Sequence, residues 1–231
     1  SVRQEVGITI GRQTNSSSTI FYYDNLESRV SGWTTQAYTG DDIWHQTELK
    51  SSSATHSWWA GLESQSTYDN GSRIDGAVIT PAIDLTSSVG PITLLFAENF
   101  VTELGWDNCM VDVTNDGGVT WSPLRGMYGA APSGDTHGWQ ISTLDLTVYT
   151  GQTINIRFYF DTGDANFNNF PGWFVDDIVI FDQSGSIAGG KFFDENNNSI
   201  KDPGERGVKD WLITASGPVT ITTRTSDRGR Y

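Results

Sequence analysis

Residues 110–121 read MVDVTNDGGVTW, and this stretch decides the fold class. Apolar and polar residues alternate over 110–114, which is the two-residue period of a strand with one buried face. The turn-forming residues NDGG follow at 115–118 and are a strong hairpin signal, so residues 119–121 are expected to form the returning strand. The stretch therefore predicts two antiparallel strands joined by a tight turn.

Strand patterns continue on both sides of this hairpin. β-rich runs bounded by Gly, Pro or Asp lie at 77–83, 92–97, 154–160 and 173–180. No segment sustains a helical period over three turns. Short strands with turns at this spacing are typical of a sandwich of two sheets, so we expect an all-β protein.

The composition agrees with this class and narrows the partners. The 231 residues include 14 Lys or Arg and 28 Asp or Glu, a formal net charge of −14. Because phosphate groups bind to cationic surfaces, we expect no nucleic acid partner, and no apolar run approaches the roughly 20 residues that insert into a membrane. Cys109 is the one cysteine, so no internal disulfide can form. Calcium is the natural counter-ion for such an acidic β-protein.

Charge also divides the chain into two parts. Residues 1–186 carry 7 basic and 22 acidic side chains, whereas residues 187–231 carry 7 and 6. The change falls at small polar residues that suit a linker. We therefore expect an N-terminal lead-in at 1–19, a large domain at 20–182, a linker at 183–186 and a small domain at 187–231. Since the start lacks a signal segment and the end reads as a turn entering a strand, we expect a piece of a longer exported protein.

A succession of short motifs in the large domain carries a family resemblance. The motifs are FYYDNLES at 21–28, TPAIDL at 80–85, VTNDGGVTW at 113–121, LDLTVYTG at 144–151 and GWFVDDI at 172–178. This order resembles the MAM-like jelly-roll modules of secreted and surface proteins, including those near the C-terminus of immune-inhibitor-A-type metalloproteases. The resemblance covers residues 20–182. It implies a jelly-roll β-sandwich without catalytic residues, serving adhesion, anchoring or substrate docking.

Residues 194–205, DENNNSIKDPGE, have the ligand order of the twelve-residue calcium loop. Side-chain oxygens fall at positions one, three, five, nine and twelve, and position seven would offer its backbone carbonyl. The predicted ligands are therefore Asp194, Asn196, Asn198, Ile200, Asp202 and Glu205. Ser199 replaces the usual glycine at position six. The alternative is that this Asp/Asn-rich stretch is simply a turn.

Strands rather than helices are expected around this loop, at 186–193, 207–214 and 219–225. The pattern F-x-D-x-N-x-N at 192–198, followed by DPGE at 202–205, resembles the calcium-binding B-type repeats of Sdr-like surface adhesins. The resemblance runs from residue 186 to the end. It implies a small β-sandwich with further strands, so we expect the domain at 187–231 to be truncated.

A second, weaker ion site is expected in the large domain. The first and last strands of a jelly roll are commonly neighbours, so Asp24 and Glu27 could converge with Asp176 and Asp177. Grouped anions in a partly buried place are unfavourable unless a cation joins them. The resemblance to jelly-roll modules that hold a structural calcium supports Asp24, Glu27 and Asp176 as ligands. The alternative is that these carboxylates are solvated or bind turn amides.

The remaining candidates concern sugar binding and catalysis. The pair Trp58–Trp59 is a possible sugar platform, because exposed indoles offer a large apolar contact, although burial in the core is the simpler explanation. The three histidines form no His-Glu-x-x-His pattern, and no nucleophile elbow occurs. A glycosidase needs only two carboxylates, and inspection of so acidic a chain leaves that mechanism open.

These observations favour a non-catalytic, calcium-binding accessory or adhesion module. It would belong to a larger secreted or cell-surface protein, with a secreted protease or a surface adhesin as the parent. The expected partner is an extracellular protein or a glycan surface, and the expected cofactor is one calcium ion or two. The alternative is a carbohydrate-binding module attached to a glycoside hydrolase.

Overall fold

A computed structural model describes residues 6–11, 18–28, 32–182, 188–196, 201–215 and 221–231. The chain divides into two compact units. Ser18–Gln183 form the first, which we call the sandwich unit. Ser1–Ser17 and Ser184–Tyr231 together form the second, which we call the small unit.

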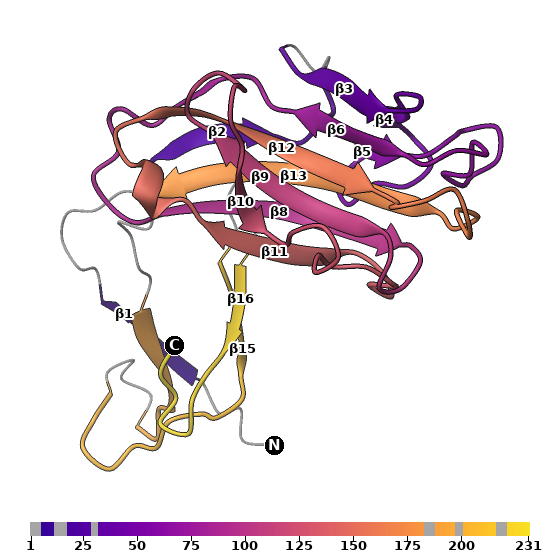
Figure 1. Cartoon of the computed structure of the whole chain (residues 1–231). Helices are drawn as coiled ribbons and strands as arrows, with labels where there is room; N and C mark the ends of the chain where they lie inside the picture. The colour runs from indigo at the N-terminus through magenta and orange to yellow at the C-terminus, as the bar shows by residue number, and fades with distance from the viewer. Residues whose placement is uncertain (1–5, 12–17, 29–31, 183–187, 197–200, 216–220) are drawn as a thin grey trace. The chain divides into compact units, whose positions relative to one another are not determined.

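Two antiparallel sheets build the sandwich unit (Figure 1). We name each after its central strand. The β12 sheet has the order β10 (Ser122–Arg125), β9 (Asn108–Thr114), β12 (Thr153–Asp161), β6 (Asp75–Ile79), β3 (Thr34–Thr39), with β7 (Ile83–Asp84) also paired to β12. The β13 sheet has the order β11 (Gln140–Asp145), β8 (Ile92–Val101), β13 (Gly172–Asp182), β5 (Ser57–Ala60), β4 (Trp44–Thr47), with β2 (Ile20–Asp24) also paired to β13.

The core of the unit follows from the alternation of side chains along β12. Ile154, Ile156, Phe158 and Phe160 are fully buried, whereas the residues between them face the other side of the sheet. Phe158 packs edge-to-face against Phe96 and Trp173 of the opposite sheet, with ring centroids 5.1 and 5.9 Å apart. Burial of a side chain of this size stabilises the fold by about 1.5–3 kcal/mol.

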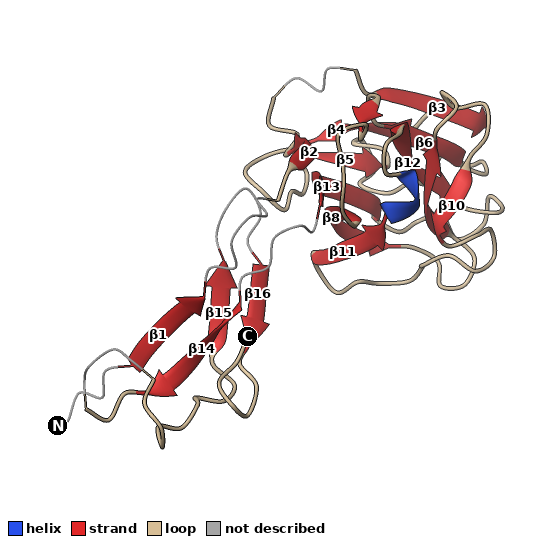
Figure 2. Ribbon diagram, turned by 90° about the vertical axis from the view of Figure 1, so that its left-hand side faces the viewer, coloured by secondary structure: helices blue, strands red, loops and turns tan. Residues whose placement is uncertain are grey.

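The expected all-β class is confirmed. Within the described residues, helix is limited to one turn of 3₁₀ helix, η1 (Thr147–Tyr149) (Figure 2). The strand expected to return at 119–121 is wrong in position, because β10 begins at Ser122. Asp116 binds the backbone and hydroxyl of Thr120 (2.9 and 2.6 Å), and Gly117 and Gly118 adopt positive φ. These contacts widen the turn and delay the strand.

The small unit contains two short antiparallel pairs. β1 (Val6–Gly11) pairs with β14 (Ala188–Phe193), and β15 (Leu212–Ala215) pairs with β16 (Ile221–Arg224). The segment expected as an N-terminal lead-in therefore contributes a strand to this unit. The strand expected at 207–214 begins only at Leu212, because Asp210 takes a positive φ and its N–H donates to the Thr225 carbonyl. The expected linker at 183–186 lies outside the described residues, which reach Asp182 and resume at Ala188.

Helices long and apolar enough to cross a bilayer do not occur in the described ranges.

Candidate functional site

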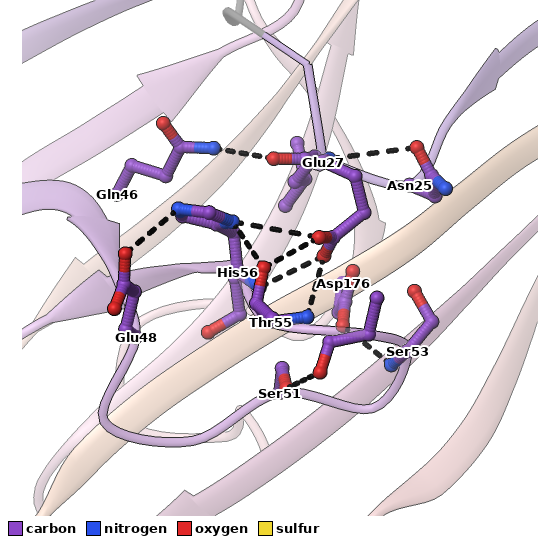
Figure 3. A network of polar contacts seen from close by, with 12 residues as sticks. Asn25, Glu27, Gln46, Glu48, Ser51, Ser53, Thr55, His56 and Asp176 are labelled. Atoms are coloured by element: carbon purple, nitrogen blue, oxygen red, sulfur yellow. Dashed lines mark hydrogen bonds and ion pairs between the residues drawn. The ribbon is translucent and has the colours of Figure 1, made fainter.

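The loop at residues 51–56 binds two carboxylates that the sequence analysis singled out (Figure 3). Asp176 lies in β13 and is fully buried. Its Oδ2 accepts the N–H groups of Ser52 (2.8 Å) and Ser53 (3.0 Å), and its Oδ1 accepts that of Asp177 (2.7 Å). Asp177 has a φ of 50° and lies where the register of β13 against β8 shifts. This bulge turns the Asp176 carboxylate toward the loop.

Glu27 is bound by the next residues of the same loop. Its Oε1 accepts the N–H groups of Thr55 (2.9 Å) and His56 (2.8 Å), and its Oε2 accepts the Thr55 hydroxyl (2.6 Å). These hydrogen bonds, chiefly that from the Thr55 side chain, lower the pKa of Glu27 to about 2. The loop thus holds Asp176 and Glu27 with successive backbone amides.

The environment of Asp176 differs from that of Glu27. Burial raises the pKa of Asp176 to about 7, against its ordinary 3.8, and the neighbouring Asp177 adds to the rise. The Oγ of Ser53, in the loop beside it, is buried and lacks a hydrogen-bond partner. A buried carboxylate next to an unpaired hydroxyl oxygen suits a hard cation, which takes several oxygen ligands. Calcium binding at this place stays a prediction.

Asp24, another predicted ligand, binds other groups. Asp24 binds the N–H of Leu26 (2.8 Å) and the indole N–H of Trp33 (2.8 Å), which is the turn role named as the alternative. The strands β2 and β13 are neighbours as expected, with Asp24 opposite Ile178. Three or more His, Cys, Asp or Glu side chains do not converge on a metal position anywhere in the part of the chain that the structure describes.

A shallow hollow of about 520 Å³ lies beside the network. Its lining consists of Gln46, Thr47, Glu48, Leu49, His56 and Glu63. His56 lies between two carboxylates, with Nε2 3.3 Å from Glu48 and Nδ1 3.5 Å from Glu27. Its Nδ1 is also 2.7 Å from the Thr55 hydroxyl. Because that hydroxyl donates its proton to Glu27, His56 is not placed to remove the proton for nucleophilic attack.

The predicted calcium loop of the small unit is described in part. Glu205 is buried, and its two oxygens accept the N–H groups of Glu195 (2.8 Å) and Asp202 (2.9 Å). The Asn196 amide donates to Asp202 Oδ2 (2.7 Å). Asp194 is buried at the end of β14, whose last residue Phe193 bonds to the Arg206 carbonyl. Asn198 and Ile200 lie outside the described residues.

The predicted sugar platform at Trp58 and Trp59 is wrong, because both indoles are buried in β5. Trp58 packs in the core against Trp33, with ring centroids 5.5 Å apart. Trp59 stacks on Phe174 at 5.2 Å and donates its indole N–H to the Pro171 carbonyl (2.7 Å). Neither ring offers a free face to a sugar.

A different aromatic group occupies the outer face of the β12 sheet. The Arg157 guanidinium lies 4.6 Å from the Trp121 ring, 4.5 Å from Tyr159 and 5.4 Å from Tyr38. It is fixed by Asp112 (2.8 Å) and by the Tyr38 hydroxyl (2.7 Å). Sequence reasoning missed this group, although Arg157 and Tyr159 occupy the outward positions of an alternating strand. We call these five residues the Arg157 platform.

Known proteins match this chain by sequence and by structure. No family model matches the chain. Bacillopeptidase F of Bacillus subtilis (strain 168) is 24% identical over 194 residues, which are 84% of this chain but only 13% of that protein. The chain thus spans about an eighth of the length of this curated relative.

Solved structures similar to the chain include an adhesin domain and a xylan-binding domain. The K3 cleaved adhesin domain of Lys-gingipain from Porphyromonas gingivalis W83 gives a TM-score of 0.44 at 20% identity, covering 70% of this chain and 99% of that one. The CBM22-1 xylan-binding domain of Xyn10C from Paenibacillus barcinonensis gives 0.43 at 11% identity, covering 75% and 100%. At these identities the likeness is one of fold.

Proposed function

We propose that the chain is a non-catalytic, calcium-binding accessory or adhesion module of a larger exported protein. Its sandwich unit would be a MAM-like jelly roll and its small unit a B-repeat-like domain. The observation that supports this best is the loop at 51–56, which gathers Glu27 and the fully buried Asp176 beside the unpaired Ser53 Oγ.

A calcium ion would compensate the negative charge of the buried carboxylate that this loop binds. The Asp176 carboxylate is cut off from water, and the charged groups around it are acidic rather than basic. Calcium takes carboxylate, hydroxyl and carbonyl oxygens as ligands together. Glu27 and Asp176 offer the carboxylates, and the loop offers hydroxyl and carbonyl oxygens. When bound, the ion would supply positive charge. The chain's own residues orient the carboxylates and exclude solvent.

The loop of the small unit supports a second calcium. Glu205, at the twelfth position, turns both oxygens into the loop toward the amides of Glu195 and Asp202. Asp194 and Glu205 are both buried there. A domain with so few residues gains much of its stability from a metal when it lacks disulfides.

Calorimetric titration of the chelator-treated chain with Ca²⁺ tests the proposal. We expect two binding events, of which Asp176→Asn removes one and Glu205→Gln the other. Asp145→Asn is the matched control, since Asp145 is an exposed carboxylate whose Oδ1 accepts the Thr147 N–H. The absence of heat and of bound calcium in the unmodified chain would overturn the calcium part of the proposal.

An exported parent fits the same features. A loop of carboxylates and amides binds calcium at the 10⁻⁴–10⁻³ M affinities of extracellular modules. Cys109 is buried and free, so the described residues are held without a disulfide. The similarity to bacillopeptidase F supports a protease as the parent. Such a module would serve as a spacer or docking unit outside the cell.

Glycan recognition is the second candidate, and the Arg157 platform favours it. Tyr38 is exposed, and Trp121 and Tyr159 are half-buried around a fixed guanidinium, which suits stacking and hydrogen bonding to a sugar. Affinity electrophoresis in neutral polysaccharide gels tests this, with Trp121→Ala as the variant. Equal mobility in gels with and without polysaccharide would remove this candidate.

A further inference from the structure

Three loops at one end of the sandwich unit present large apolar side chains to solvent. They are the β8–β9 loop (102–107), the β10–β11 loop (126–139) and the β12–β13 loop (162–171) (Figure 1). Their exposed side chains are between 59% and 77% accessible and comprise Leu104, Trp106, Met127, Tyr128 and Phe167. We call these five residues the loop-end patch.

Contacts between the loops make the patch one surface on a fixed backbone. The Asn108 side chain donates to the Trp106 carbonyl (2.6 Å) and accepts the Gly129 N–H (2.8 Å), which joins the first two loops. A carbon added at Gly163 would lie 3.1 Å from the Tyr128 hydroxyl and 3.7 Å from the Trp106 carbonyl. The third loop therefore adjoins the same two residues.

The composition of the patch favours a protein partner over a glycan. Contiguous apolar surface on a folded unit usually marks an interaction site. Trp, Tyr, Phe and Met are the residues enriched at the centres of protein interfaces. Sugar rings stack on aromatic faces, but Leu104 and Met127 offer no such face.

The charges around the patch are acidic. Glu103 and Asp164 come from two of the three loops, and both act on the buried Asp107, whose pKa rises to about 6, chiefly through burial. Asp135 lies exposed in the remaining loop. The whole chain carries a formal charge of −14. An acidic rim of this kind steers and selects a basic partner.

The guanidinium of Arg73 lies near the patch, but it does not change the acidic character of its surroundings. The Arg73 guanidinium lies 5.8 Å from the centre of the Tyr128 ring. It is paired with Asp161 (2.7 Å) and with Asp75 (3.5 Å), so its charge is already compensated. Its position also shows that the Tyr128 ring accepts a cation on its face.

We propose that the loop-end patch binds a protein segment in which an apolar side chain is flanked by Lys or Arg. The apolar side chain packs between Trp106 and Tyr128, and the cationic groups lie over the exposed rings beside Glu103 and Asp164. This inference rests on the proposed role as an accessory or adhesion module, and it names the surface and the chemistry of the partner.

A library of random dodecapeptides displayed on phage tests the proposal. The library is first depleted on the Trp106→Ala/Tyr128→Ala variant and then panned against the calcium-loaded whole chain. We expect enriched peptides that combine an aliphatic or aromatic residue with Lys or Arg. Synthetic versions should bind the unmodified chain, lose at least tenfold in affinity with Trp106→Ala, and bind more weakly as salt rises.

Trp211→Ala serves as the matched control, because Trp211 is an exposed indole of the small unit. It should bind the peptides unchanged, and all variants should keep the circular dichroism spectrum and calcium binding of the unmodified chain. Panning that yields no shared sequence, yields acidic peptides, or yields peptides indifferent to Trp106→Ala would overturn the proposal. Retention in polysaccharide gels that Trp106→Ala abolishes would assign the patch to glycans instead. Intact calcium binding beside any of these failures would leave the proposed function standing.

Discussion

Glu98 of β8 and Arg125 of β10 form a buried ion pair that joins the two sheets of the sandwich. The pair is bidentate, with the two guanidinium nitrogens 2.5 and 2.9 Å from the two carboxylate oxygens. The Trp173 indole N–H and the Ser142 hydroxyl complete the shell of Glu98. The Glu98 side chain is inaccessible to solvent, and the Arg125 side chain is 15% exposed. Removing one partner of such a pair is costly because the other charge is left buried and unpaired.

We expect Arg125→Met to destabilise the sandwich unit by about 3–5 kcal/mol, because it leaves the Glu98 carboxylate buried without a cation. The double variant Glu98→Leu/Arg125→Met should recover most of this loss, since neither charge remains. Urea unfolding followed by tryptophan fluorescence measures both changes. Equal losses in the single and the double variant would show that packing, and not the unpaired charge, is the cause.

The buried Asp107 predicts a pH dependence of stability. Its carboxylate accepts the Tyr68 hydroxyl and the Glu103 N–H, while its Oδ1 lacks a partner, and burial raises its pKa to about 6 from the ordinary 3.8. A raised folded pKa gives stability that is full below pH 3.8 and lost as pH rises through 6. We expect the stability difference between the unmodified chain and Asp107→Asn to shrink by about 3 kcal/mol between pH 3.5 and 7.5. Urea midpoints at the two pH values supply the measurement, and an unchanged difference would contradict it.

Calcium removal should affect the two units separately. A ligand that binds only the folded state stabilises it by about 2.7 kcal/mol at a hundredfold excess over Kd. Chelation should therefore lower the melting temperature of each unit, with Glu205→Gln reproducing the loss in the small unit and Asp176→Asn that in the sandwich unit. Scanning calorimetry with and without EDTA shows the change. Superimposable traces from a protein proven free of metal would count against both sites.

Gly172 opens β13 in a conformation that other residues seldom adopt. Its φ is +89°, and an added Cβ would collide with the Ala60 carbonyl and lie 3.2 Å from the Tyr68 ring. We expect Gly172→Ala to lower the unfolding free energy by more than about 1 kcal/mol, since strain and collision act together. Gly71→Ala is the control, because it has a similar φ and open space around it. Equal effects at both positions would assign the loss to φ alone.

Period-two patterns predicted the central strands well and the edge strands poorly. Ile154, Ile156 and Phe158 alternate with outward residues, so β12 is visible in the sequence. β3 reads TTQAYT and buries little, which leaves no apolar period to detect. Such a strand is held by backbone pairing with β6, and that pairing is set by tertiary structure.

The candidate functional site was also only partly predictable from the sequence. We expected Glu27, near the first strand, to converge with Asp176 on the last strand. Their common partner is the loop at 51–56, which has no distinctive motif. The prediction that Trp59 is a sugar platform was wrong because the outer face of β5 is covered. Trp59 stacks on the Phe174 ring, and Lys50 lies over that ring. A side chain buried on both faces of its strand cannot be recognised from alternation.

The pairing of β1 with β14 makes the small unit discontinuous, with the whole sandwich unit inserted between its halves. Thr19 and Asp182 bond to each other through backbone and side chain (3.0 and 2.7 Å), so the folded sandwich brings its two ends together. The two halves of the small unit are separated in sequence by the sandwich unit, whose ends Thr19 and Asp182 are 163 residues apart. Once the sandwich unit has folded, only a short gap between the two halves remains to be closed, and closing it costs less entropy. During synthesis, β1 leaves the ribosome first, and its partner strand β14 is made only later. We therefore expect the inserted sandwich unit to fold before the two halves of the small unit meet.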